Sequence, residues 1–173
     1  MEFQIDLAKI SDSAELNRLV NSAYRGDSSR KGWTTEADLL DGIRIDEERL
    51  KELAQKTNSY LLLLRNSQHE IVACVHLEEK GSSLYLGMLT VDPKIQNQGL
   101  GKILLKAAEE KAREFKLKSV FMTVISERKE LIDWYVRHGY HKTGKTEPFP
   151  TNDPRFGLPK KPLEFLVLEK LLT

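Results

Sequence analysis

The chain of 173 residues carries 27 basic and 26 acidic side chains, a balance that gives nucleic acid and anionic membranes no strong field to follow. The length fits one domain over residues 1–173, and the only cysteine, Cys74, excludes both an intrachain disulfide and a cysteine-built metal site. The first residues lack the basic and apolar regions of a signal peptide, and no apolar run reaches transmembrane length. We therefore expect a cytoplasmic protein without a membrane partner.

The N-terminal part of the sequence predicts one strand followed by helices. Residues 2–8 alternate apolar and polar side chains, which is typical of a half-buried strand. Asp12 and Glu15 have the spacing of a capping box, and the helix that they open should stop near Gly26. After a polar stretch, residues 34–40 predict a short helix and residues 46–56 a longer one, each with a capping residue at its start.

The rest of the chain predicts strands interrupted by two further helices. Apolar runs over residues 60–64, 71–78 and 83–91 are joined by short turns, which predicts an antiparallel meander. Apolar side chains at spacings of three and four then predict a helix over 100–115. A strand is expected over 119–124, a helix over 128–138 that stops at Gly139, a strand from 140 to 145, a loop over 148–162 and a last strand over 163–169.

This order of elements predicts the fold class. An antiparallel meander beside crossovers through helices gives an α/β (or α+β) domain with a mixed sheet. We expect about seven strands and about four to five flanking helices.

Residues 91–102 have the arrangement of an anion-binding site: a strand, a polar loop with two glycines and the start of a helix. First-turn amides have no acceptor within their helix, and Gly99 and Gly101 let the backbone approach a phosphate. A P-loop is excluded because residue 103 is isoleucine, and the dinucleotide pattern fails because residue 104 is leucine. The pattern that remains is Gln96-x-x-Gly99-x-Gly101. The alternative is a strand–loop–helix connection that binds no ligand and in which the two glycines serve only the turn.

This loop and the order of elements resemble the GNAT acetyltransferases over essentially the whole chain, with the most specific part at residues 84–140. The resemblance implies a sheet that splays at the cofactor site and acetyl-CoA as the cofactor. It also implies a pyrophosphate held by loop amides, and pantetheine amides that pair with the strand edge at the gap. The cofactor-binding residues expected from it are Leu89, Val91, Gln96, Asn97, Gln98, Gly99, Leu100, Gly101 and Lys102.

A second segment of the resemblance is the helix that ends at Gly139-Tyr140, where Tyr135 matches the family's tyrosine beside the CoA sulfur. A phenol has an unperturbed pKa of about 10 and can donate a proton. The resemblance therefore implies that Tyr135 protonates the leaving thiolate as general acid. The alternative is a core role in which Tyr135 packs with Trp134.

Two positions depart from the family pattern. Arg128 stands where an asparagine often meets the cofactor, and we expect it to reach a CoA phosphate instead. Tyr85 stands where several members have a glutamate as general base, so Tyr85 is expected to line the acceptor site without acting as base. The candidates for the base are His76 and Glu78, which share one face of the neighbouring strand. One alternative is a water chain that ends in bulk solvent and takes the proton, and the other is an edge histidine beside solvated acids.

The acceptor site is expected under the segment between the first helices, which roofs this site in the family. Trp33, Glu36 and Asp38 offer an aromatic wall and two acids to a cationic amine, and the acids are also alternative bases. Arg25 and the basic residues after it could instead face a carboxylate, as in an amino-acid substrate. Threonines and acids are also ordinary residues at a helix start.

Together these residues predict an acetyl-CoA-dependent N-acyltransferase that acetylates a primary amine of a small molecule by direct attack in a ternary complex. Two alternatives stay open: acetylation of a protein lysine or N-terminus, and a non-catalytic acetyl-CoA sensor without a proton donor. No histidine pair has metal-ligand spacing, so no metal is expected. The sequence is compatible with a homodimer, and it leaves the acceptor and the acyl chain open.

Overall fold

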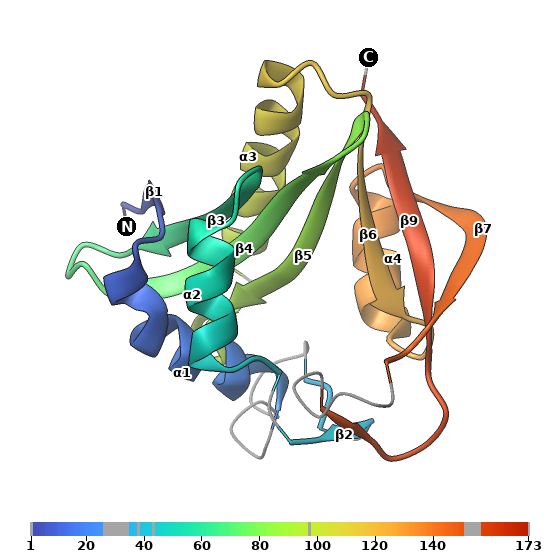
Figure 1. Cartoon of the computed structure of the whole chain (residues 1–173), viewed down its shortest axis with the longest axis horizontal. Coiled ribbons are helices and arrows are strands. Elements are labelled where there is room, and N and C mark those ends of the chain that lie inside the picture. Colours follow the sequence, from blue (N-terminus) through green and yellow to red (C-terminus); the bar gives the residue numbers. More distant parts are fainter. Residues whose placement is uncertain are drawn as a thin grey trace.

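Within the part of the chain that the computed structural model describes, seven strands form one open mixed sheet in the order β1-β3-β4-β5-β6-β9-β7 (Figure 1). The described residues are 2–25, 35–37, 39–42, 44–96, 98–150 and 157–172. The neighbours β5 and β6 are parallel, and all other neighbouring strands of this sheet are antiparallel. In sheet order the strands are β1 (Gln4–Leu7), β3 (Ser59–Arg65), β4 (Ile71–Lys80), β5 (Ser83–Val91), β6 (Ser119–Ile125), β9 (Glu164–Leu171) and β7 (His141–Pro148).

Two helices cover each face of this sheet (Figure 1). On one face lie α1 (Ser13–Tyr24) and α2 (Glu47–Gln55), and on the other α3 (Leu100–Glu114) and α4 (Lys129–Arg137). The leucine run of β3 explains both layers, because successive strand side chains point to opposite faces. Leu61 and Leu63 are buried with α1 and α2, whereas Leu62 and Leu64 are buried with α3 and α4. The predicted fold class, a mixed sheet with flanking helices, is confirmed.

Local signals set several helix boundaries. Asp46 caps α2 by accepting a hydrogen bond of 2.7 Å from a first-turn amide, and Gly139 follows the end of α4 with a φ of +95°. The predicted capping box of Asp12 and Glu15 is wrong, since the Glu15 carboxylate accepts instead from the Ile71 amide of β4 at 3.2 Å. None of the helices in the described ranges is long and apolar enough to cross a membrane.

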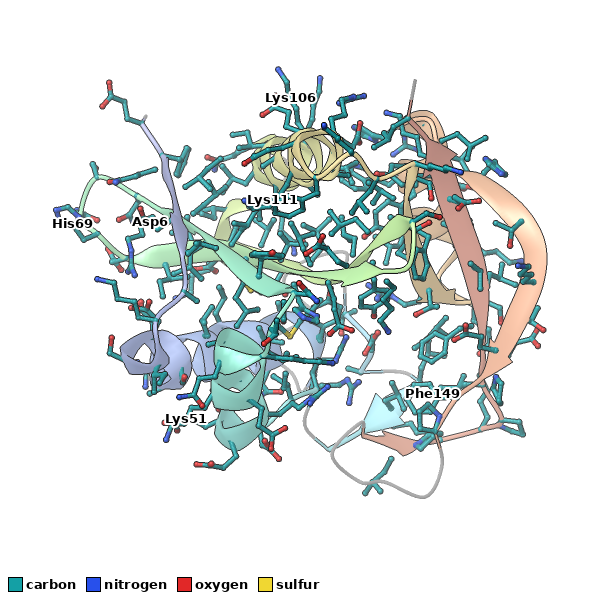
Figure 2. All side chains as sticks on the ribbon, turned by 45° about the horizontal axis from the view of Figure 1, so that its top comes forward. Asp6, Lys51, His69, Lys106, Lys111 and Phe149 are labelled. Carbon is teal, nitrogen blue, oxygen red and sulfur yellow. The ribbon has the colours of Figure 1, made fainter. Side chains whose placement is uncertain are left out.

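The short helix predicted over residues 34–40 is wrong for the described part of that segment. Leu40–Asp41 is the strand β2, which pairs with β8 (Leu158–Pro159) in a separate two-stranded sheet. The predicted loop over 148–162 therefore contains a strand. Leu40 is buried with Ile125 and Phe149, and Figure 2 shows Phe149 beside this small sheet. Contacts with distant residues thus decide the extended backbone at residue 40.

Strands β5 and β6 separate after a short paired stretch (Figure 1). Their pairing covers residues 83–85 opposite 119–121, so residues 86–91 of β5 have no described strand on that side. A bulge at Met88, with a φ of +55°, bends β5 where it runs along β4. The predicted splay is confirmed, and it opens the sheet between its two helical layers.

Candidate active site

Two hollows meet where β5 leaves β6. The first, here called the β5–β6 cavity, has a volume of about 430 Å³ and is lined by α1, β4, β5, β6 and α4. The second, here called the α3–α4 groove, has a volume of about 470 Å³ and is lined by the loop after β5 and by α3 and α4. Leu89 and Leu131 line both hollows, which therefore adjoin at these two side chains.

The α3–α4 groove is built on the glycine loop. Gly99 is the N-cap of α3, with a φ of +81°, and its carbonyl accepts the first helical bond, from the Ile103 amide at 3.1 Å. The amides before Ile103 therefore point out of the helix end without an acceptor in the helix. Gln96 closes the loop onto β5, because its side chain donates to the Val91 carbonyl at 3.1 Å. Most of the predicted loop residues line the groove: Gln96, Gly99, Leu100, Gly101 and Lys102.

Gly101 stands where α3 and α4 approach each other closely. A Cβ at residue 101 would lie 3.4 Å from the Trp134 ring, so any longer side chain would extend into the groove. Trp134 forms the facing wall and stacks on His138, with ring centroids 4.3 Å apart. The groove thus has a positive helix end at one side and apolar side chains that lead to Leu89 at the other. These two characters fit the pyrophosphate and the pantetheine arm of coenzyme A.

The edge of β5 beside the groove carries the two residues predicted to pair with pantetheine, Leu89 and Val91. Both carbonyls already accept a hydrogen bond within the chain, Val91 from Gln96 and Leu89 from the hydroxyl of Tyr24 in α1. A carbonyl has two lone pairs, and this edge has no neighbouring strand among the described residues. The edge is therefore still geometrically able to pair with ligand amides. Gln98 lies in the same loop, and Asn97 lies outside the described residues.

Tyr135 faces the β5–β6 cavity from α4 and is almost fully buried, with 3% of its surface exposed. Its ring packs edge-on against Trp134 and Tyr140, with centroid distances of 5.1 and 5.8 Å. The hydroxyl has no hydrogen-bond partner in the described part of the chain. Burial raises the pKa of Tyr135, so the phenol keeps its proton throughout the physiological range.

His76 and Glu78 line the same cavity from β4, and they share one face as predicted, with 3.9 Å between His76 Nε2 and Glu78 Oε1. The same ring nitrogen lies 2.8 Å from Ser59 Oγ. Burial lowers the pKa of His76 to about 4, so its ring is neutral at physiological pH. Burial alone would raise the pKa of Glu78, but Lys56, 3.0 Å away, outweighs it, so Glu78 is ionised and paired.

Tyr85, which was predicted to line the acceptor site, lies along the β5–β6 cavity. It lies opposite Glu78 in the β4–β5 register and touches His76 edge-on, with ring centroids 6.1 Å apart. Trp33 and Asp38, the other residues predicted there, lie outside the described residues. Among the described residues, no three His, Cys, Asp or Glu side chains lie close enough to hold a metal ion.

Glu36 belongs to the described residues of the 35–42 segment, here called the roof, and its side chain is buried above the cavity. One carboxylate oxygen pairs with Arg25 at 2.8 Å and the other with Arg128 at 3.0 Å. Burial alone would raise the pKa of Glu36, but Arg128, Arg25 and Arg44 outweigh it and hold that pKa below its usual range. Both oxygens are engaged by guanidinium groups, so Glu36 is poorly suited to the predicted role of attracting a cationic amine.

Arg128, which was predicted to reach a CoA phosphate, is held by a buried acid. It lines the β5–β6 cavity and not the α3–α4 groove, and its guanidinium carbon lies 5.3 Å from the centroid of the Tyr24 ring. The physical reason is the buried carboxylate of Glu36, 92 residues away in the sequence, which accepts a hydrogen bond from Arg128. A charge inside the fold attracts this side chain, and no local pattern reveals that charge.

Replacing Glu36 by glutamine should lower the free energy of unfolding by about 1.5–3 kcal/mol at pH 7, because two buried guanidinium groups lose a charged acceptor. The pKa of Glu36 is depressed in the fold, so its stabilisation is full above an unfolded pKa of about 4.3 and is lost as pH falls through the folded value. The free energy of unfolding, measured with urea, should therefore be higher for the wild type than for Glu36→Gln at pH 7. This difference should become smaller as the pH is lowered.

The control for this prediction is Glu52→Gln, which removes an exposed pair with Arg49. That change should alter stability by less than about 1 kcal/mol. Equal losses in the two variants, or a gap that does not depend on pH, would contradict the role of Glu36 in holding the roof.

Three residues of this region escaped sequence reasoning: Tyr24, Arg44 and Ser59. Tyr24 and Arg44 line the cavity, and Ser59 contacts His76 within it. Each stands in an ordinary position at a helix end, in a loop or at a strand start, and gives no signal by spacing. Their roles arise from contacts across the sheet, such as the bond from Tyr24 to Leu89, 65 residues later.

Comparison with known proteins gives one family match. The profile of the acetyltransferase (GNAT) family matches residues 17–140. This range includes the glycine loop, the diverging part of β5 and all of α4.

Solved structures with the same fold include three named acetyltransferases. The ribosomal-protein-S18-alanine N-acetyltransferase from Escherichia coli has a TM-score of 0.72 and 14% identity, with 99% of this chain and 95% of that chain covered. The PaiA N-acetyltransferase from Thermoplasma acidophilum, solved with coenzyme A, has a TM-score of 0.71 and 15% identity, with 99% and 100% covered. The IAA acetyltransferase from Bacillus cereus has a TM-score of 0.68 and 13% identity, with 99% and 100% covered. At these identities the likeness shows the fold.

Proposed function

Because the chain belongs to the acetyltransferase (GNAT) family, we propose that it transfers an acetyl group from acetyl-CoA to a primary amine of a small molecule. Family membership makes the chain an N-acetyltransferase with acetyl-CoA as its cofactor. The acceptor and the roles of single residues are the proposal. The observation that carries it is the meeting of groove and cavity at Leu89 and Leu131, with Tyr135 on the cavity side.

The roof favours a small acceptor over a protein chain. Glu36 ties the roof to α1 and α4, and Lys160 donates to the Ala37 carbonyl at 2.7 Å. Phe149 and Pro150 line the cavity as well. A cavity of about 430 Å³ is in the range of small-molecule sites, whereas a protein lysine or N-terminus needs an open groove.

Bound acetyl-CoA supplies an acyl group activated as a thioester. The first-turn amides of α3, the Gln96 loop and the wall formed by Trp134 are the parts of this chain that would hold it. The edge of β5 at Leu89 would orient its arm toward the cavity. These residues position and shield the reacting end, and positioning of this kind can account for roughly 7–11 kcal/mol of a barrier.

We assign the proton donor to Tyr135. Its Oη has no partner among the described residues and is protonated at every working pH, because burial raises the pKa of Tyr135. The phenol therefore carries its proton at the junction of groove and cavity, where the O–H can donate a hydrogen bond to a group that gains negative charge and protonate it as the leaving thiolate forms. Burial also disfavours a lasting phenolate, so the proton must be restored from solvent in each cycle.

We assign the proton acceptor to His76, acting through water, with Glu78 as its neighbour. Direct attack by the amine is supported by Cys74, which is buried and has a pKa raised by burial to about 12, and so is unsuited to form an acyl intermediate. The same free thiol suits a reducing compartment, and we propose the cytoplasm as the place of action.

The acid limb of the kcat/KM profile should follow the pKa of the acceptor amine. Burial lowers the pKa of His76 to about 4, so its ring stays unprotonated from about pH 5 to 8 and adds no titration of its own to the profile. With two acceptors whose amine pKa values differ, the apparent pKa of the acid limb should therefore shift by the difference between the two amine pKa values. A limb that stays near the ordinary histidine value of about 6.5 for both acceptors would contradict a buried, neutral His76.

The proposed function is tested by following thiol release from acetyl-CoA with a panel of amines: amino acids, polyamines, aminoglycosides and peptides. Turnover with a small amine and none with peptides is the expected result. Turnover with peptides alone would refute the small-molecule acceptor.

A further inference from the structure

The β5–β6 cavity has a surplus of positive charge. Both acids that line it are already neutralised: Glu78 has Lys56 at 3.0 Å and Lys80 at 3.7 Å, and Glu36 has two arginines. The cavity therefore presents cationic side chains to whatever enters it. Among its described lining residues, six are cationic and two are acidic: Arg25, Arg44, Arg49, Lys56, Lys80 and Arg128 against Glu36 and Glu78.

Of the six cationic residues that line the cavity, Arg44 is the one without an acid paired to it among the described residues. Its guanidinium carbon lies 5.6 Å from the centroid of the Tyr24 ring, and it forms no ion pair with any acid in the described part of the chain. It is close enough to Glu36 to help lower the pKa of that carboxyl. Arg49, in contrast, pairs with Glu52 at 3.1 Å. The carboxylate of Glu36 thus faces three arginines, of which two are paired with it and the third, Arg44, is not. This arrangement favours the binding of an additional anion.

Tyr24 places this cationic site beside the reacting centre. Its ring contacts the guanidinium groups of both Arg44 and Arg128. Its hydroxyl donates to the carbonyl of Leu89, which is one of the two residues where the cavity and the groove adjoin. The cationic end and the proposed site of acetyl transfer are therefore separated by about the length of one tyrosine side chain.

From these contacts, and resting on the proposed function, we infer that the acceptor is a short amine with an anionic group, a carboxylate or a phosphorus oxyanion, and that Arg44 selects it. The anion is bound by Arg44 together with Arg128, and the amine points to Leu89. The same cationic surroundings disfavour the ammonium form of the bound amine and increase its neutral, attacking form. This effect lessens the demand on a base.

The test uses ligands that differ only in charge and needs no turnover. N-acetylglycine is compared with N-acetylglycinamide, N-acetyl-β-alanine with its amide, and a phosphonate analogue is added to separate the two kinds of anion. Binding is measured by calorimetry, to the protein alone and with coenzyme A. The acids should bind at least about 10-fold more tightly than the amides, because a charge-assisted hydrogen bond is lost in the amide.

Three variants assign that preference. In Arg44→Gln the affinities for acid and amide should come to within about twofold of each other, and Arg44→Lys should keep part of the preference. The control Lys51→Gln removes a surface charge of α2 that lines neither hollow, and it should keep the whole preference. Arg44 has no ion pair among the described residues and its guanidinium group lies over the ring of Tyr24, so its loss should lower the melting temperature far less than Glu36→Gln does. Thermal unfolding of both variants is measured alongside.

Equal affinity of the wild type for acids and amides, or an unchanged preference in Arg44→Gln, would overturn the inference. Neither result would contradict the proposed function, which then still predicts thiol release with amines that carry no anionic group. Failure of the proposed function looks different: only peptides, or no amine at all, would release thiol from acetyl-CoA, whatever affinity the protein has for the N-acetylated acids.

Discussion

Replacing Tyr135 by phenylalanine is expected to lower kcat by about 10²- to 10⁴-fold and to leave the affinity for coenzyme A unchanged. The ring of Tyr135 packs against Trp134 and Tyr140, and phenylalanine keeps that packing. Its hydroxyl has no partner among the described residues, so its removal leaves no other group unsatisfied. Only the proton donor is lost. Thiol release at saturating substrate measures kcat, and calorimetry measures cofactor binding.

Tyr140→Phe is the matched control for this result. Tyr140 is also a buried tyrosine and packs against Tyr135, but its hydroxyl donates to Glu109 at 3.2 Å and it lines neither hollow. We expect a loss of about 1 kcal/mol in stability and no change in kcat. Unchanged kcat in Tyr135→Phe would refute the proton-donor role, and an equal fall of kcat in Tyr140→Phe would assign the effect to packing.

Replacing Gly101 by glutamate should raise the Kd of coenzyme A by at least about 100-fold, or ~2.7 kcal/mol. The new side chain starts 3.4 Å from Trp134 and has to extend into the α3–α4 groove. Its carboxylate would then occupy the positive end of α3, where the pyrophosphate is expected to bind, and would repel it. Calorimetric titration with coenzyme A measures the loss.

Two further variants separate charge from size. Ile103→Glu adds the same charge in the same turn, but Ile103 is 38% exposed and does not line the groove, so affinity should stay near that of wild type. Gly101→Ala adds only the Cβ in contact with Trp134 and should cost less than about 10-fold. Retained affinity in Gly101→Glu would contradict the assignment of the loop to the cofactor.

The parts of this protein that follow from local patterns were predictable. The glycine loop required only the spacing of Gln96, Gly99 and Gly101 and the strand and helix that flank them. The cap at Asp46 and the stop at Gly139 also act within a few residues of chain. The shared face of His76 and Glu78 follows from the alternation of a strand. In each case the energy that decides the structure comes from neighbours in sequence.

The acceptor side was less predictable because its side chains respond to residues that are distant in sequence. Glu36 was expected to meet a cationic amine, yet it is buried between Arg25 and Arg128. Residue 40 was expected in a helix, yet it pairs with residue 159. Neither partner has a spacing that sequence reasoning could use.

The sequence by itself thus determined the fold class, the strands of the main sheet, its four flanking helices and the glycine loop after β5, because hydrophobic periodicity and backbone capping act over a few residues. Only the tertiary structure decided which charges neutralise each other, and it left Arg44 without an ion pair among the described residues. The physical reason is that a charge inside a fold is attracted to the nearest opposite charge in space, and folding, not spacing along the chain, sets that distance.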